Sequence, residues 1–358
     1  MTRGQRFGLL AILLVLLSGC GDQRAPSNTA IVLAIAVSAR HQWTFLFPNP
    51  AVTVSSLASK ASGSEFYTIS VTASSYPAAL ARVQEQSARV VFTQDVKVIV
   101  LGAALSGPQV AQIVSSMTES GLVPARAWLV ATQASPAQVL MHYTPQTTVP
   151  VYALADYFDC ASCHYTDLGV RGWQWWVRSM TPGVSPVLPV ARPTATGLDV
   201  SRLLVYPTQG RPVLMPAPLT VGWAYLSGKV HEASLALTVD GHPYVLSSMG
   251  ASARVRCVRV AGTVDVTVRM QAHGEIANSP PQRVLLPQDE TRVEAAGAAA
   301  LAHLAARTIS WANHTHTDPF GYAMQASWGQ PADVALTPLP IRARIWVTVR
   351  VQGEGMNR

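Results

Sequence analysis

The chain has 358 residues, of which 49% are hydrophobic and only 13% are charged, and its formal net charge is +7. This composition excludes a disordered chain, and the length is enough for several domains that each bury a core. The basic residues form no cluster along the sequence, so nucleic-acid binding is not indicated. Proximity to anionic lipid headgroups is a sufficient reason for a mild positive excess.

The first residues have the pattern of a lipoprotein leader. Arg3 and Arg6 precede an uninterrupted apolar run at residues 9–17, and small residues then lead to Cys20. The pattern predicts a signal peptide at residues 1–19, cleavage before Cys20, and a diacylglycerol on its thiol that anchors the mature chain to membrane lipid, with acyl chains such as palmitate. An ordinary cleaved signal followed by a chance cysteine is the alternative. An uncleaved span is not favoured, because the nine apolar residues fall short of the ~20 needed to cross a bilayer.

A polar segment at residues 20–29 is expected to tether the body of the protein to the membrane. Residues 30–190 then predict an N-terminal α/β domain. Apolar and β-branched runs indicate its strands, and serine, glycine and proline start signals indicate its helices. The expected strands are 30–37, 66–72, 96–101 and 127–131, and the expected helices begin near Pro77, Gly107 and Pro136.

A further helix is expected at residues 173–180, where apolar side chains recur at positions i, i+3, i+4 and i+7. The side chains that share this face are Trp173, Trp176, Val177 and Met180. Together with Trp175, the tryptophans could offer a stacking platform. Their helical spacing favours packing in a core or between domains instead.

Proline and glycine are dense at residues 191–218, which are expected to form a linker to a C-terminal domain at residues 219–353. Short strand candidates in that domain are divided by Asp240-Gly241 and Ala261-Gly262, which suit hairpin turns, so antiparallel sheet is expected. The expected strands are 235–239, 244–246, 253–260, 264–270 and 341–351, with a long helix at 289–313. The fold class is therefore α+β, with a mixed α/β N-terminal domain followed by antiparallel strands and a long C-terminal helix. The C-terminal domain could comprise two subdomains.

Five stretches of the sequence occur in an order that resembles one known family. They are residues 20–24 running into 30–37, residues 92–102, residues 182–189, the pentapeptide at residues 318–322, and residues 341–351 with Gly353. The chain resembles the Ger(x)C family, the lipoprotein C subunits of nutrient germinant receptors in spore-forming bacteria. Gly21 and Ser38 depart from the family pattern, which often has tryptophan and aspartate at these places.

The resemblance implies mixed α/β domains, no enzymatic activity and no cofactor. It also implies a role in spore germination, through assembly with two integral membrane subunits of the receptor, the A-type and the B-type. The place of action would be the outer face of the cytoplasmic (inner spore) membrane, with Cys20 as the lipidation site.

The remaining cysteines are Cys160, Cys163 and Cys257, too few for a disulfide framework. Cys160 and Cys163 precede His164 with the spacing of a c-type haem attachment site. We favour a local disulfide or two free thiols in a loop, because the aromatic neighbours suit packing and nothing nearby predicts a helical body that could enclose a haem. A zinc site would need further ligands that are not nearby.

The sequence His314-Thr315-His316-Thr317-Asp318 has the form of a His-x-His-x-Asp metal site. It follows the long helix, however, where histidines can interact with the negative helix end and Asp318 can begin the next turn. A structural role is therefore favoured.

No catalytic motif is complete. The chain has no G-x-S-x-G elbow and no H-E-x-x-H helix. The segment at residues 222–230 departs from a phosphate-binding loop in its glycine spacing, and Val230 replaces the required hydroxyl.

Two other functions stay open. A lipid-anchored solute-binding protein would need two doubly wound lobes, and a haem lipoprotein would depend on residues 160–164 alone.

Overall fold

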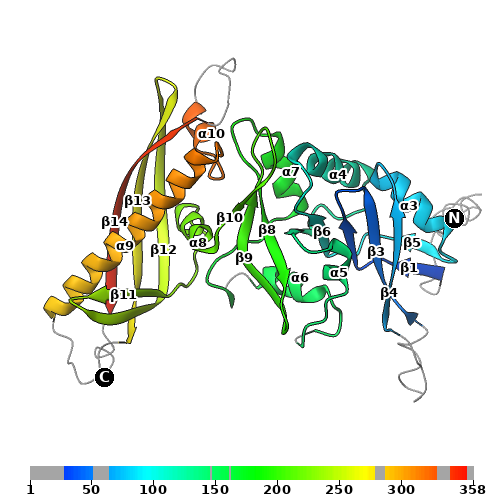
Figure 1. Ribbon diagram of the computed structural model, residues 1–358, viewed down its shortest axis with the longest axis horizontal. Coiled ribbons are helices and arrows are strands. Elements are labelled where there is room, and N and C mark those ends of the chain that lie inside the picture. Colours follow the sequence, from blue (N-terminus) through cyan, green and yellow to red (C-terminus); the bar gives the residue numbers. More distant parts are fainter. Residues whose placement is uncertain are drawn as a thin grey trace, which may run out of the picture.

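The computed structural model describes residues 28–50, 64–145, 147–160, 163–278, 287–328 and 339–352. It contains an eight-stranded sheet and a four-stranded sheet, and Figure 1 shows them toward opposite ends of an elongated molecule. The fold is α+β, as the sequence predicts. Cys20, the leader and most of the tether lie outside the described residues. None of the described helices is both long and apolar enough to span a membrane.

The eight-stranded sheet has the order β10-β9-β8-β7-β6-β2-β3-β4. Its middle strands β2, β6, β7 and β8 run parallel, and antiparallel strands flank them on both sides. A separate parallel pair is formed by β1 and β5. The strands are β1 (Thr29–Ile31), β2 (Ala34–Val37), β3 (Gln42–Pro48), β4 (Phe66–Thr72), β5 (Val90–Phe92), β6 (Val98–Gly102), β7 (Trp128–Thr132), β8 (Val187–Pro193), β9 (Leu198–Val205) and β10 (Val213–Met215).

Helices cover both faces of this sheet, which explains why its parallel strands are apolar throughout. One face packs against α3, α4 and α7, and the other packs against α5 and α6. The helices are α3 (Tyr76–Glu85), α4 (Gly107–Ser120), α5 (Pro136–Leu140), α6 (Tyr152–Asp159) and α7 (Gly172–Met180). The predicted helix starts are confirmed, whereas the single strand expected at residues 30–37 is divided into β1 and β2.

The expected linker at residues 191–218 is wrong. Half of this stretch belongs to β8, β9 and β10, which form one side of the eight-stranded sheet. Pro189 lies within β8 opposite Leu203, and the register of β8 shifts between Val190 and Arg192. A proline lacks a backbone N–H, but it can be accommodated in a strand near such an irregularity. High proline content therefore did not prevent sheet formation here.

The four-stranded sheet has the order β11-β12-β13-β14. The strands are β11 (Leu235–Val239), β12 (His242–Val260), β13 (Thr263–Asn278) and β14 (Ile341–Gln352). The predicted turns are confirmed, because Asp240-Gly241 and Ala261-Gly262 all have positive φ between antiparallel strands. The purely antiparallel expectation is wrong for β14, which pairs parallel to β13. Helix α9 supplies the crossover that a parallel pair requires.

Helices α8 (Ala217–Leu226), α9 (Pro287–His314) and α10 (Tyr322–Ser327) gather on one face of the four-stranded sheet. Helix α9 approaches α8 closely at Gly222, where a Cβ atom would overlap Thr308 Oγ1. At its end, Asn313 donates from Nδ2 to the Ile341 carbonyl and accepts from the Ile341 N–H, both at 2.8 Å. These bonds join the end of α9 to the start of β14. One continuous core links this layer with the larger sheet.

Candidate functional site

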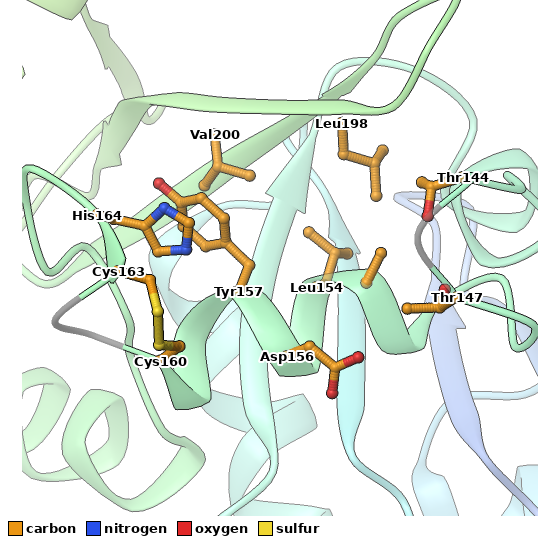
Figure 2. Close-up of a pocket in the computed structure, with 11 residues that line it drawn as sticks. Thr144, Thr147, Leu154, Asp156, Tyr157, Cys160, Cys163, His164, Leu198 and Val200 are labelled. Carbon is orange, nitrogen blue, oxygen red and sulfur yellow. A yellow bond between two sulfur atoms is a disulfide. The ribbon is translucent and has the colours of Figure 1, made fainter.

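Cys160, Cys163 and His164 line one end of a pocket between α6 and β9 (Figure 2). The pocket has a volume of about 330 Å³, and a neighbouring hollow that shares Tyr157, Cys163 and His164 continues towards α8. Cys160 and Cys163 are joined by a disulfide, with their Cα atoms 5.3 Å apart. The structure therefore has the local disulfide rather than two free thiols.

The aromatic pair at this end of the pocket is tightly stacked. The rings of Tyr157 and His164 have centroids 3.7 Å apart and are inclined by only 24°. Burial raises the pKa of the Tyr157 hydroxyl and lowers the pKa of the His164 imidazole. In Figure 2 His164 lies flat against Tyr157, and its neighbouring sulfurs are bonded to each other. This arrangement does not fit covalent haem attachment, which needs two thiols and a histidine directed at the iron.

Replacing both cysteines, as Cys160→Ser with Cys163→Ser, should leave the fold intact. The disulfide closes a very short loop, so removing it should lower the free energy of unfolding by no more than about 2 kcal/mol. Denaturant unfolding of the two proteins measures this difference. The wild-type protein should also lack a Soret band after denaturation, and a band that survives denaturation would refute this account.

The three side chains of the possible metal motif at residues 314–318 differ in their exposure to solvent. His314 and His316 are exposed, whereas Asp318 is completely buried. The Asp318 carboxylate accepts hydrogen bonds from the backbone N–H groups of Phe320, Gly321 and Ala323 at 3.2, 2.8 and 2.7 Å. Burial raises the pKa of this carboxyl, and the backbone N–H groups oppose that shift. Across the described residues, no three His, Cys, Asp or Glu side chains are placed to hold a metal ion.

The Asp318 turn joins the two halves of the molecule. The backbone N–H of Asp318 donates a hydrogen bond to Ser185 Oγ at 2.9 Å. In return, the backbone N–H of Ser185 donates to the Asp318 carbonyl, also at 2.9 Å. The next carbonyl, that of Pro319, accepts from Arg178 of α7 at 2.7 Å and from Trp223 of α8 at 3.1 Å. The motif recognised in the sequence is therefore a structural junction.

The buried and exposed tryptophans of α7 are the reverse of those expected from the helical spacing. Trp175 is fully buried and packs edge-on against Tyr206. The face expected to pack in a core or between domains is exposed instead, and its side chains retain between 38% and 64% of their accessible surface: Trp173, Trp176, Val177 and Met180. We call these four residues the α7 face. Helix α7 is oriented by the deeply buried Trp175, which the i, i+3, i+4 pattern did not include.

Two other polar candidates have structural roles. The segment at residues 222–230 is the buried end of α8 and the turn after it, where Lys229 pairs with Asp167 at 3.1 Å. Burial raises the pKa of the Cys257 thiol to about 12. Because the thiolate is the reactive form, Cys257 is not suited to act as a nucleophile at neutral pH.

The comparisons with known proteins agree with this architecture. The family model described as spore germination protein N-terminal domain matches residues 22–193. Among solved structures, the chain is similar to the crystal structure of the GerBC protein, with a TM-score of 0.57 and 15% sequence identity over 89% of this chain and 96% of that chain. No curated protein matches the chain. Residues 22–193 are therefore a spore germination protein N-terminal domain, the chain has the fold of GerBC, and both findings support the resemblance to the Ger(x)C family.

Proposed function

We propose that the chain is a lipid-anchored subunit of a nutrient germinant receptor that acts by binding and assembly rather than by catalysis. The observation that carries the proposal is the spore germination domain at residues 22–193. Cys20 would hold the protein at the outer face of the inner spore membrane, beside integral A-type and B-type subunits. Confinement to the membrane raises the effective concentration of its contact surfaces, so modest contacts with these subunits suffice.

The α7 face is the surface that best supports assembly. Its apolar side chains are exposed together on one helix, and Trp176 is fixed by a hydrogen bond from its Nε1 to Ser115 Oγ of α4 at 3.3 Å. Aromatic residues that are exposed and already fixed lose little conformational entropy on binding, and they are enriched where proteins meet. We assign this face to contact with the integral subunits.

The solute-binding alternative is less well supported. A transporter's solute-binding protein would need two doubly wound lobes, whereas the second half of this chain is a four-stranded sheet with α8, α9 and α10 on one face. The haem alternative depends on residues 160–164, whose sulfurs are bonded to each other.

Deleting the chain should abolish the response of spores to one class of nutrient, and leave spore formation and nutrient-independent germination unchanged. Complementation with the wild-type chain should restore the response. A chain with Trp173→Ser and Val177→Ser should restore it only weakly, because the α7 face loses apolar contact area. Trp328→Ser, which removes a tryptophan that is 73% exposed elsewhere, is the matched control and should complement fully.

Germination is followed by the loss of optical density of the spore suspension after each nutrient is added. A normal response to every nutrient after deletion of this chain and all its paralogues would contradict the proposed function. Full complementation by the Trp173→Ser, Val177→Ser chain would leave the receptor role intact and would refute the assignment of the α7 face.

A further inference from the structure

The uncovered face of the four-stranded sheet carries a cluster of arginines that the strand register assembles. Arg254 of β12 lies opposite Arg269 of β13, and Arg269 lies opposite Trp346 of β14. In the adjacent row on the same face, Arg256 and Arg344 flank Thr267. The next row ends in Arg342 and completes the set. We call these residues the basic sheet face: Arg254, Arg256, Arg269, Arg342, Arg344 and Trp346.

The side chains of the basic sheet face are open to solvent. All five arginines are exposed, and within the described part of the chain none of their guanidinium groups forms an ion pair. The three rows contain a single carboxylate, Asp265, which lies opposite Arg342. Helices α8, α9 and α10 all pack against the other face, where β13 buries Val264, Val266 and Val268.

This arrangement is unfavourable in the isolated protein. Like charges directly opposite each other on neighbouring strands are destabilising, and Arg254 and Arg269 are such a pair. Apolar groups share the same surface, because Trp346 is 52% exposed and Val258 and Val260 retain almost half of their accessible area. A surface with concentrated positive charge, an amphipathic indole and exposed valines matches the headgroup region of an anionic bilayer.

We infer that the basic sheet face binds the anionic headgroups of a phospholipid bilayer. The guanidinium groups can each engage phosphate oxygens through paired N–H donors, and the Trp346 indole suits the boundary between headgroups and acyl chains. The inference uses the membrane location given in the proposed function but not the receptor role. It therefore stands or fails on lipid binding alone.

Such binding would fix the orientation of the molecule. The four-stranded sheet lies at the opposite end from β1, where the described chain begins (Figure 1). The tether from Cys20 to Asn28 spans at most about 26–29 Å when fully extended. Attachment at both the tether and the sheet would lay the long axis of the molecule along the membrane surface.

The test measures binding of the unlipidated chain from Gly21 onward, which retains every described contact of the fold, to vesicles of phosphatidylcholine with and without phosphatidylglycerol. The chain should bind only the vesicles that contain phosphatidylglycerol, and less tightly as the salt concentration rises. Each arginine close to an anionic surface contributes roughly a fivefold gain in partition coefficient. The double change Arg256→Gln with Arg344→Gln should therefore lower the partition coefficient roughly 25-fold.

Arg40→Gln with Arg211→Gln is the matched control. It removes the same charge from exposed positions outside the four-stranded sheet and should lower binding only slightly.

A separate change, Arg269→Gln, should weaken binding and also raise the melting temperature, since it removes the repulsion from Arg254. A loss of binding through unfolding would lower that temperature instead. No binding to phosphatidylglycerol vesicles, or an equal loss in both double variants, would overturn the inference. Binding to a single-stranded oligonucleotide but not to vesicles would overturn it in favour of nucleic acid.

Discussion

Replacing Asp318 by alanine should lower the free energy of unfolding by at least about 3 kcal/mol. The change leaves three buried backbone N–H groups without an acceptor, and each unsatisfied group costs about 1–3 kcal/mol. The turn also places the Pro319 carbonyl between Arg178 and Trp223, so the contact between the two halves should loosen. Denaturant unfolding, followed by tryptophan fluorescence, measures the loss.

Asparagine at this position separates the hydrogen bonds from the volume of the side chain. Asp318→Asn keeps an acceptor oxygen for Phe320 and Gly321 but turns an amide N–H₂ group towards the Ala323 N–H, so we expect an intermediate loss of roughly 2 kcal/mol. Asp240→Asn is the matched control. It removes only an exposed ion pair with Arg292, worth less than about 1 kcal/mol. Equal losses in these two variants would refute the structural role of Asp318.

Cys20→Ala should release the protein from the membrane or leave an unprocessed precursor. Two acyl chains are the usual minimum for stable anchoring, and we propose that the lipid on Cys20 supplies them. The anchor lies outside the described fold, so the folded domains should be unaffected. Cys257→Ala is the matched control, because this half-buried thiol lies on β12, and the variant should stay in the membrane fraction.

Immunoblotting of membrane and soluble fractions, with size separating precursor from processed chain, checks the result. The basic sheet face predicts one further detail. A small part of a correctly processed Cys20→Ala chain should remain on anionic membranes at low salt and dissociate at high salt. A processed Cys20→Ala chain that fractionates like the wild type at every salt concentration would refute the anchor.

Local signals in the sequence were sufficient to predict the limits of elements that have their own start and stop residues. Helix α4 begins after Ser106 with a capping box and ends at Gly121, whose φ of 64° suits glycine, so its limits could be read directly. The hairpin turns at residues 240–241 and 261–262 were predictable for the same reason. Each of these features depends on a few neighbouring residues.

Features that depend on distant residues could not be predicted in this way. Helix α7 is oriented by Trp175 and its contact with Tyr206, so a helical period alone assigned the wrong face to the core. The basic sheet face was missed because its arginines alternate with buried or half-buried residues on three strands. Only the register of β12, β13 and β14 brings them into adjacent rows. A count of charges along the sequence does not contain that information.

The central claim, that the chain is a membrane-held subunit of a germinant receptor, is tested most directly by its neighbours in the spore membrane. The tagged protein would be solubilised from spore inner membranes in mild detergent, captured, and its partners identified by mass spectrometry, with the Trp173→Ser, Val177→Ser chain captured in parallel. We predict that two multispanning subunits of one germinant receptor copurify with the wild-type chain and are depleted from the variant. Capture of a transporter's membrane subunits, or of no integral membrane protein from membranes that retain the receptor, would contradict the account.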